Sequence, residues 1–293
     1  MRMESSTDCS DGSHRPAASR IRPLHFLSVV IRRSARGAAN LAARKSFATT
    51  RCPDSLPHLV IGHSSLLLRR LEGTDPRLQE NKAVSLRLAC EVMDGTIISP
   101  GETFSFWRIV GRPGTDRGFL PGLQLDSGRL VSRSGGGLCQ LSNLLHWMIL
   151  HTTMDVTERH RHGTDPFPDD RRTVPFGTGA TVFWNYLDLA FRNATHAVFQ
   201  VRTWVDDEYL CGEIRSDSAP AEVLSVEERG HRFVRAPGGP VYRENELWRL
   251  RSDASTGAVL SEERIMANRI EVLYDPLSIP GNIVEESPDC RVQ

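Results

Sequence analysis

The sequence lacks any apolar run long enough to cross a lipid bilayer. A membrane-spanning helix needs about 20 consecutive apolar residues, and the nearest candidate, residues 24–31, is far shorter and contains His25 and Ser28. A secretory signal peptide needs a basic start, a continuous apolar stretch and a small-residue cleavage site, and residues 1–53 have only the basic character. We therefore expect a cytoplasmic protein without a signal peptide, either free or peripheral to the inner membrane.

Paired cysteines and a net charge are also missing. No two of the six cysteines form a Cys-x-x-Cys motif, which argues against a thiolate zinc site or a redox couple. A chain of 293 residues does not need disulfide bonds to hold its core, so a reducing compartment fits best. Basic and acidic residues each number 36, so no basic nucleic-acid footprint is visible. We expect no nucleic-acid partner, no metal and no cofactor.

Residues 1–55 are predicted to form a basic, disordered arm. Eight Arg and Lys residues between positions 20 and 51 meet no acidic residue between Asp11 and Asp54. A second interpretation is a basic amphipathic segment on the anionic surface of the inner membrane. After the arm, the predicted organisation is a core domain over residues 56–215 and a β-rich extension over 216–293 that packs on the core.

Two helices are predicted ahead of a run of strands. Apolar residues at three- and four-residue steps predict a helix over residues 80–93, with Cys90 as a core thiol. A similar stripe predicts a second helix from Cys139 to about Thr152. Short strands are predicted between and after them, including one over residues 180–184. This order is typical of an α+β fold: few helices packed on a mixed or antiparallel sheet, a helix-opening cysteine and a β-rich C-terminal half.

Three consecutive glycines stand directly before Cys139. Glycine tolerates positive φ and lets a substrate approach the backbone closely. The first N–H groups of a helix have no internal partner, and a cysteine placed there is expected to have a lowered pKa and a reactive thiolate. The N–H groups of residues 139–140, with the side chain of Gln140, are expected to stabilise an oxyanion during acyl transfer.

A thiolate nucleophile usually needs a base nearby. His160 and His162 follow a predicted strand and stand two apart, so on a strand they face the same side. His162 is the candidate base and His160 the reserve. His146 lies about 10 Å along the helix axis from Cys139, so direct contact is not expected.

Other interpretations of these residues stay open on the sequence alone. A lone buried cysteine is more often a small core residue than a nucleophile. A glycine-rich loop before a helix also suggests phosphate binding, although neither established glycine pattern for it is present. The two histidines around Arg161 form only a weak zinc pattern. Glu102 and Arg159 have an equal alternative in a salt bridge within the fold. The predicted substrate contacts are Gly135, Gly136, Gly137, Ser142, Glu102, Arg159 and His160.

Several segments in this order resemble the VanW family, the vancomycin B-type resistance protein family, in its short form. Residues 135–142 resemble the central family motif, and residues 100–106 resemble the upstream motif. Residues 158–162 resemble the segment whose last histidine recurs in the family. Residues 180–193 resemble the downstream motif. With matches at residues 79–82 and 244–249, the resemblance spans about residues 60–275.

The resemblance implies work on the cell wall. Short members are associated with vancomycin-resistance gene clusters, and long membrane-anchored relatives are similar to cysteine-dependent L,D-transpeptidases that cross-link peptidoglycan. Carried over, it implies that Cys139 accepts an acyl group from a peptidoglycan-like peptide or precursor and that His162 is the base. Many members have Asp where this chain has Gly179, so Asp188 or Glu158 would have to orient the histidine. The alternatives are a non-catalytic module that binds a wall precursor or glycopeptide, and a scaffold at the membrane surface.

Overall fold

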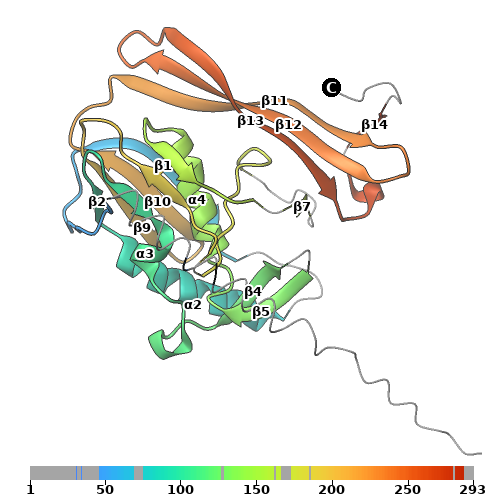
Figure 1. The fold of residues 1–293 in the computed structure, drawn as a ribbon, viewed down its shortest axis with the longest axis horizontal. Coiled ribbons are helices and arrows are strands. Elements are labelled where there is room, and N and C mark those ends of the chain that lie inside the picture. Colours follow the sequence, from blue (N-terminus) through green and yellow to red (C-terminus); the bar gives the residue numbers. More distant parts are fainter. Residues whose placement is uncertain are drawn as a thin grey trace, which may run out of the picture. The chain divides into compact units, whose positions relative to one another are not determined.

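The computed structural model describes most of the chain beyond residue 45 (Figure 1). The chain divides into two units, Met1–Ala43 and Arg44–Gln293. Most of the predicted basic arm, including its amphipathic segment, lies outside the described residues. All helices and strands below belong to the second unit. The described residues are 46–68, 75–126, 129–161, 163–165, 173–184, 186–279 and 281–286, with Ile31 and Ser34 in the first unit.

The described core begins at Ser46, earlier than the predicted boundary at residue 56. The Ala48 N–H donates to the Thr103 carbonyl at 3.0 Å, and the Cys52 N–H donates to the Gly95 carbonyl at 2.8 Å. Ala48 is buried. These contacts are between backbone groups, which the side-chain pattern of the segment does not reveal. Residues 46–55 are therefore part of the core rather than of the arm.

A four-stranded antiparallel sheet lies at the centre of the core, and two helices pack on one of its faces (Figure 1). Gly212 of the sheet faces Leu144 and Met148 of one helix. Thr203, which pairs with Gly212, donates to the Cys90 carbonyl of the other helix. The strand order is β1 (His58–Leu66), β10 (Tyr209–Ser216), β9 (Phe199–Val205) and β2 (Thr96–Ile98), and the helices are α2 (Pro76–Met93) and α4 (Cys139–Leu150).

Helix α2 begins one turn before its predicted start. Asp75 caps it, because its Oδ1 accepts from the Arg77 N–H at 2.9 Å, and Pro76 stands in the first turn. The helix ends at Met93, where the Asp94 N–H donates back to the Cys90 carbonyl at 2.7 Å. Cys90 is 3% exposed, which confirms it as a core thiol.

A three-stranded sheet and a hairpin complete the part of the fold around Cys139. Phe104 and Phe191 stack across the small sheet with ring centroids 4.4 Å apart, and both are fully buried. A short helix follows directly, and its cap residue Ser105 donates to the Asp188 carboxylate at 2.6 Å. The elements are β3 (Thr103–Ser105), β8 (Ala190–Arg192) and β6 (Asp155–Glu158), the helix α3 (Phe106–Val110), the turn η1 (Thr115–Arg117), and the hairpin β4 (Pro121–Asp126) and β5 (Arg129–Ser134).

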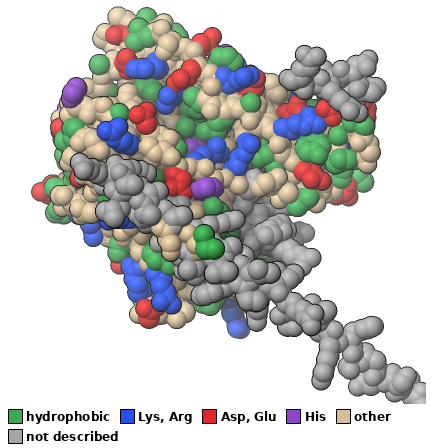
Figure 2. All heavy atoms as spheres, viewed as in Figure 1, with side chains coloured by type: hydrophobic (Ala, Val, Ile, Leu, Met, Phe, Trp, Pro, Cys, Tyr) green, Lys and Arg blue, Asp and Glu red, His purple; other side chains and the backbone are tan. Residues whose placement is uncertain are grey.

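The C-terminal part is a five-stranded sheet built on three long antiparallel strands. Cross-strand ion pairs such as Arg249–Glu263 and Arg251–Glu222 follow them, and acidic and basic side chains are interspersed over the visible face (Figure 2). The α+β class and the β-rich C-terminal half are confirmed. The described part contains no helix that is both long and apolar enough to cross a membrane. The sheet order is β14 (Ile283–Glu285), β11 (Glu222–Arg235), β12 (Val241–Asp253), β13 (Val259–Val272) and β7 (Thr164–Asp165), and η2 (Pro276–Ser278) follows β13.

Candidate functional site

Cys139 is the first residue of α4, and the glycine loop before it sets its position. Gly135 and Gly137 have φ angles of 74° and 92°, in the region that glycine adopts without strain. Leu138 caps the helix and is only 2% exposed, so it anchors the loop in the core. The chain therefore turns sharply from β5 into α4 and presents the thiol at the helix start.

Gly136 has a different role from its two neighbours. A Cβ atom at Gly136 would lie 2.0 Å from the carbonyl oxygen of Gly122 in β4. A Cβ atom at Gly122 would in turn lie 2.5 Å from the Gly136 carbonyl oxygen. The two glycines thus let the hairpin pack backbone against backbone on the loop that carries Cys139.

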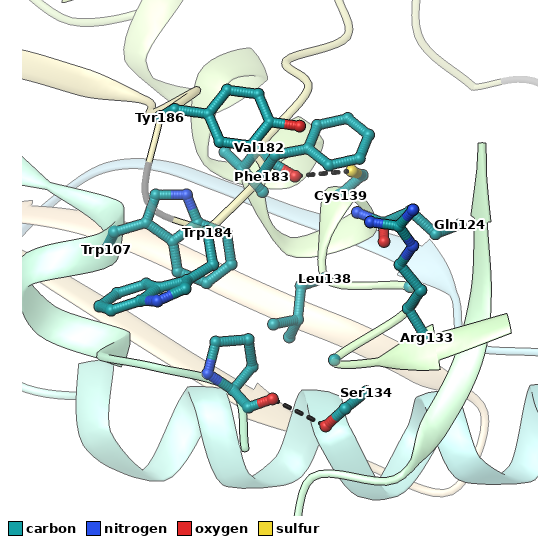
Figure 3. A pocket seen from close by; sticks show the side chains of 13 residues that line it. Trp107, Gln124, Arg133, Ser134, Leu138, Cys139, Val182, Phe183, Trp184 and Tyr186 are labelled. Atoms are coloured by element: carbon teal, nitrogen blue, oxygen red, sulfur yellow. Dashed lines mark hydrogen bonds between the residues drawn. The ribbon is translucent and has the colours of Figure 1, made fainter. Parts of the chain in front are cut away.

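The Cys139 side chain lines a cavity of about 120 Å³ (Figure 3). The thiol donates to the Val182 carbonyl oxygen, 3.7 Å from the sulfur. Gln124 and Arg133 of the hairpin contribute polar groups on one side. The cavity thus combines a thiol, a guanidinium group and apolar walls, which is the usual composition of a small-molecule or peptide site.

Four aromatic side chains line the same cavity. Trp107 and Trp184 meet edge to face with centroids 5.5 Å apart, and Trp107 Nε1 donates to the Leu187 carbonyl at 2.8 Å. Phe183 and Tyr186 stack with centroids 5.8 Å apart. Rings held in this way present flat apolar surfaces to a ligand. These residues were not predicted from the sequence, although the closely spaced aromatic residues after Val182 are an available signal.

Contacts from α4 and from the end of β6 hold residues 177–182, which lead into this aromatic wall. From α4, the Ser142 hydroxyl donates to the Ala180 carbonyl at 2.6 Å, and His146 Nδ1 lies 2.6 Å from the Thr178 carbonyl oxygen. The predicted strand over residues 180–184 is wrong, since only an isolated bridge between Phe183 and Leu187 forms there.

The end of β6 supplies the second set of contacts. Arg159 donates to the carbonyl oxygens of Gly177 and Gly179. The Thr181 N–H donates to the His160 carbonyl at 2.7 Å. Arg159 and His160 therefore fix the backbone that leads to Val182, and neither side chain lines the Cys139 cavity.

Glu158 and Asp188, which the sequence offered as partners of the histidine, and Glu102, a predicted substrate contact, all have contacts within the fold, and the Asp188 N–H donates to Glu158 Oε1 at 3.1 Å. Glu158 Oε1 lies 2.9 Å from His160 Nε2. Asp188 accepts from the Ser105 hydroxyl and from the Trp107 N–H, so it caps α3. Glu102 accepts from the Ser99 N–H at 2.8 Å, in the turn before β3.

Gln140 is engaged away from the cavity. Its Nε2 donates to the Ser65 hydroxyl at 3.0 Å and to the Leu66 carbonyl at 2.8 Å. Its backbone N–H donates to the Gly137 carbonyl at 2.9 Å. These contacts contradict the prediction that Gln140 supplies oxyanion donors. Its side chain donates to β1, and its N–H donates to a carbonyl three residues earlier in the chain. Of the predicted substrate contacts, only Gly135 and Gly137 line the cavity with Cys139.

The predicted bases differ in what the structure shows of them. His162 lies outside the described residues. His160 is half-buried, and its ring contacts Glu158. His146 is buried, and burial lowers its pKa to about 3, so it is neutral near pH 7.

The predicted lowering of the Cys139 pKa is wrong. Burial raises the pKa of the Cys139 thiol above its ordinary value of 9.0, because a buried thiolate loses its hydration. The hydrogen bond between the thiol and the Val182 carbonyl offsets only part of this rise. The ligand-free cavity therefore holds a neutral thiol at pH 7.

We expect the alkylation rate of Cys139 by iodoacetamide to rise about tenfold per pH unit from pH 7 to pH 9. Only the thiolate reacts, and a thiol whose pKa exceeds 9.0 is less than about 1% ionised at pH 7. Site-resolved mass spectrometry measures the rate, with half-buried Cys52 as an internal labelling control outside the cavity. A rate that levels off below pH 8 would instead indicate a stabilised thiolate.

Fold and site together define an α+β protein with a helix-opening cysteine in an aromatic-walled cavity. The family profile described as VanW like protein matches residues 81–215. The chain is 33% identical over 228 residues to the vancomycin B-type resistance protein VanW of Enterococcus faecalis (strain ATCC 700802 / V583), which covers 78% of this chain and 82% of that protein. The chain belongs to the VanW family, as its motifs predicted.

A second relative is more distant. The chain is 27% identical over 126 residues to the uncharacterized protein YoaR of Bacillus subtilis (strain 168), which covers 42% of this chain and 39% of that protein. No solved structure matches the chain significantly.

Proposed function

We propose that this VanW-family chain acts on a peptide of the bacterial cell wall and that Cys139 accepts an acyl group from it. The observation that carries the proposal is the placement of the thiol, at the first residue of α4 and in a cavity walled by aromatic rings. The name of the enterococcal relative associates that protein with vancomycin resistance, which supports a wall peptide as the substrate class.

In the proposed reaction, the Cys139 sulfur attacks a carbonyl carbon of the peptide. The thiol proton passes to a base, for which His162 is the candidate, because the His160 side chain does not line the cavity. A C–S bond forms, the C–N bond breaks, and the departing amine takes the proton. Water or a second amine then attacks the thioester and restores the thiol.

Because the resting Cys139 thiol is neutral, it must lose its proton after the substrate has bound. Substrate that fills the cavity brings its carbonyl beside the sulfur, and proton removal then coincides with C–S bond formation. Arg133 gives the cavity a guanidinium group, which suits the carboxylate at the end of a peptide. The aromatic rings suit its apolar faces.

Two observations favour a second function, a non-catalytic module that binds a wall precursor or glycopeptide. The Cys139 pKa is raised, and both donor groups of Gln140 are engaged elsewhere. In that case the aromatic wall and Arg133 supply the binding, and Cys139 is a small half-buried residue.

Incubating the full chain with a muropeptide and a soluble amine separates the two functions. Acyl transfer predicts a hydrolysed peptide or an amine adduct by liquid chromatography and mass spectrometry, with heat-denatured chain as the control. Muropeptide binding by calorimetry without any product would overturn acyl transfer in favour of the binding module. Neither binding nor product would overturn the choice of a wall peptide.

A further inference from the structure

A second cavity, of about 290 Å³, is lined by residues of α4, β6, β12 and β13 and of the segments that follow α4 and β6. It shares no lining residue with the Cys139 cavity. At about 30 Å³ for each water-sized group, it has room for about ten non-hydrogen atoms. Its walls are mainly apolar and include Ile149, Leu150, Met154, Val156, Ile265 and Met266.

Arg159 lines this cavity and has no carboxylate partner among the described residues. Its Nε and Nη2 atoms donate to backbone carbonyls, while Nη1 donates only to the Met266 sulfur at 3.2 Å. Sulfur is a weak acceptor. Burial, with the nearby charge of Arg161, lowers the Arg159 pKa to about 10. A half-buried cation without a counter-ion among the described residues is still costly, so an anion beside Nη1 is favoured.

His146 lines the same cavity and gives an independent sign of a missing ligand. Its Nδ1 faces the Thr178 carbonyl and must carry the ring proton, which leaves Nε2 as an acceptor. Nε2 is buried and has no hydrogen-bond partner in the described part of the chain, whereas buried polar atoms nearly always have one. A carboxylate answers both residues, because one oxygen accepts from Arg159 Nη1 and its negative charge lets Nε2 take up a proton and donate to the other oxygen.

The remaining charged residues of the cavity indicate how such a ligand lies. Asp155 is exposed and stands about 13 Å along the strand from Arg159. Arg249 is already paired with Glu263. A carboxylate is repelled by Asp155 and attracted by Arg159, so the acidic group of the ligand lies at Arg159 and its apolar body lies along the walls.

We propose that this cavity is a second ligand site, which binds a small amphipathic carboxylate: one carboxyl group on an apolar body of about eight carbons. The site is separate from Cys139 and does not depend on acyl transfer. The half-buried charge of Arg159, the unpartnered acceptor of His146 and the apolar walls all point to the same chemistry.

Octanoate is the probe. Octan-1-ol, which keeps only the alkyl group, and acetate, which keeps only the carboxylate, are the controls. We expect octanoate to bind the full chain with a dissociation constant on the order of 0.1 mM. With ¹³C-methyl methionine, the signals of Met154 and Met266 shift, and that of Met93 in the α2 core does not. Arg159→Gln weakens binding about tenfold or more, and the matched control Arg249→Gln weakens it less than about threefold.

Equal binding of octan-1-ol, equal binding of acetate, or unmoved Met154 and Met266 signals would each overturn the proposal. If Arg159→Gln does not fold, Ile265→Trp provides the test, because the larger ring fills the cavity from a half-buried strand position. Octanoate binding that survives in folded Ile265→Trp also overturns it. The assay uses no wall peptide, so its failure leaves the proposal for Cys139 untouched.

Discussion

The Gly136→Ala variant is expected to lose about 3 kcal/mol or more of its free energy of unfolding. The added Cβ would lie 2.0 Å from the Gly122 carbonyl oxygen, and the obstructing atom is backbone. The hairpin and the loop must therefore separate, and no rotation of a side chain can relieve the contact. Urea denaturation followed by circular dichroism measures the change.

Gly163→Ala is the matched control for that experiment. Gly163 is exposed, its φ is not positive, and an added Cβ meets no described atom within 4 Å, so a change below about 0.5 kcal/mol is expected there. If Gly136→Ala were as stable as Gly163→Ala, the contact between the hairpin and the Cys139 loop would not hold the site together.

Replacing Cys139 by Ala should lower turnover of a wall peptide at least about 10³-fold. The acyl group then has no acceptor sulfur, whereas the aromatic wall and Arg133 remain to bind the peptide. Muropeptide affinity should consequently change less than about threefold. Steady-state kinetics and calorimetry on the same preparation measure the two quantities.

Cys52→Ala controls for the loss of a half-buried cysteine outside the cavity and should leave turnover at the wild-type rate. If Cys139→Ala turned over the peptide within tenfold of the wild-type rate, Cys139 would not be the nucleophile. Loss of both binding and turnover would point to collapse of the cavity, which the denaturation curve of the same variant would show.

The helix-opening cysteine could be predicted from the sequence because its evidence is local. Leu141, Leu144 and Leu145 begin an apolar stripe directly after Cys139, and all three are buried. A stripe of that period needs only neighbouring residues to be recognised. The structure places the start of α4 at Cys139, where the stripe predicted it.

The conformation of the aromatic wall could not be predicted from the sequence, because residues distant in the chain decide how residues 180–184 fold. Thr181, Val182 and Phe183 favour a strand by composition. Their neighbours in space take up the backbone groups instead: the Asn143 side chain accepts from the Ala180 N–H, and Ser142 donates to the Ala180 carbonyl. Because the Ala180 N–H and carbonyl are used in this way, the segment does not pair with a strand, and it turns back at Phe183, which forms an isolated bridge with Leu187.

The pKa of Cys139 and the role of Gly136 were missed for a related reason. A helix start is visible in the sequence, but the burial that raises the thiol pKa is a property of the folded chain. The contact between Gly136 and Gly122 also joins two distant segments. Arg159, predicted to contact substrate, proves to hold Gly177 and Gly179 and to line a different cavity.

The central claim is that Cys139 carries an acyl group, and the intact mass of the chain during a single turnover tests it most directly. Wild-type chain mixed with muropeptide and quenched in acid within the first turnover should gain the mass of one acyl fragment. Peptide mapping should place the fragment on Cys139, and hydroxylamine, which cleaves thioesters, should remove it. Product formation with no adduct on Cys139, or with the adduct on another residue, would contradict the account.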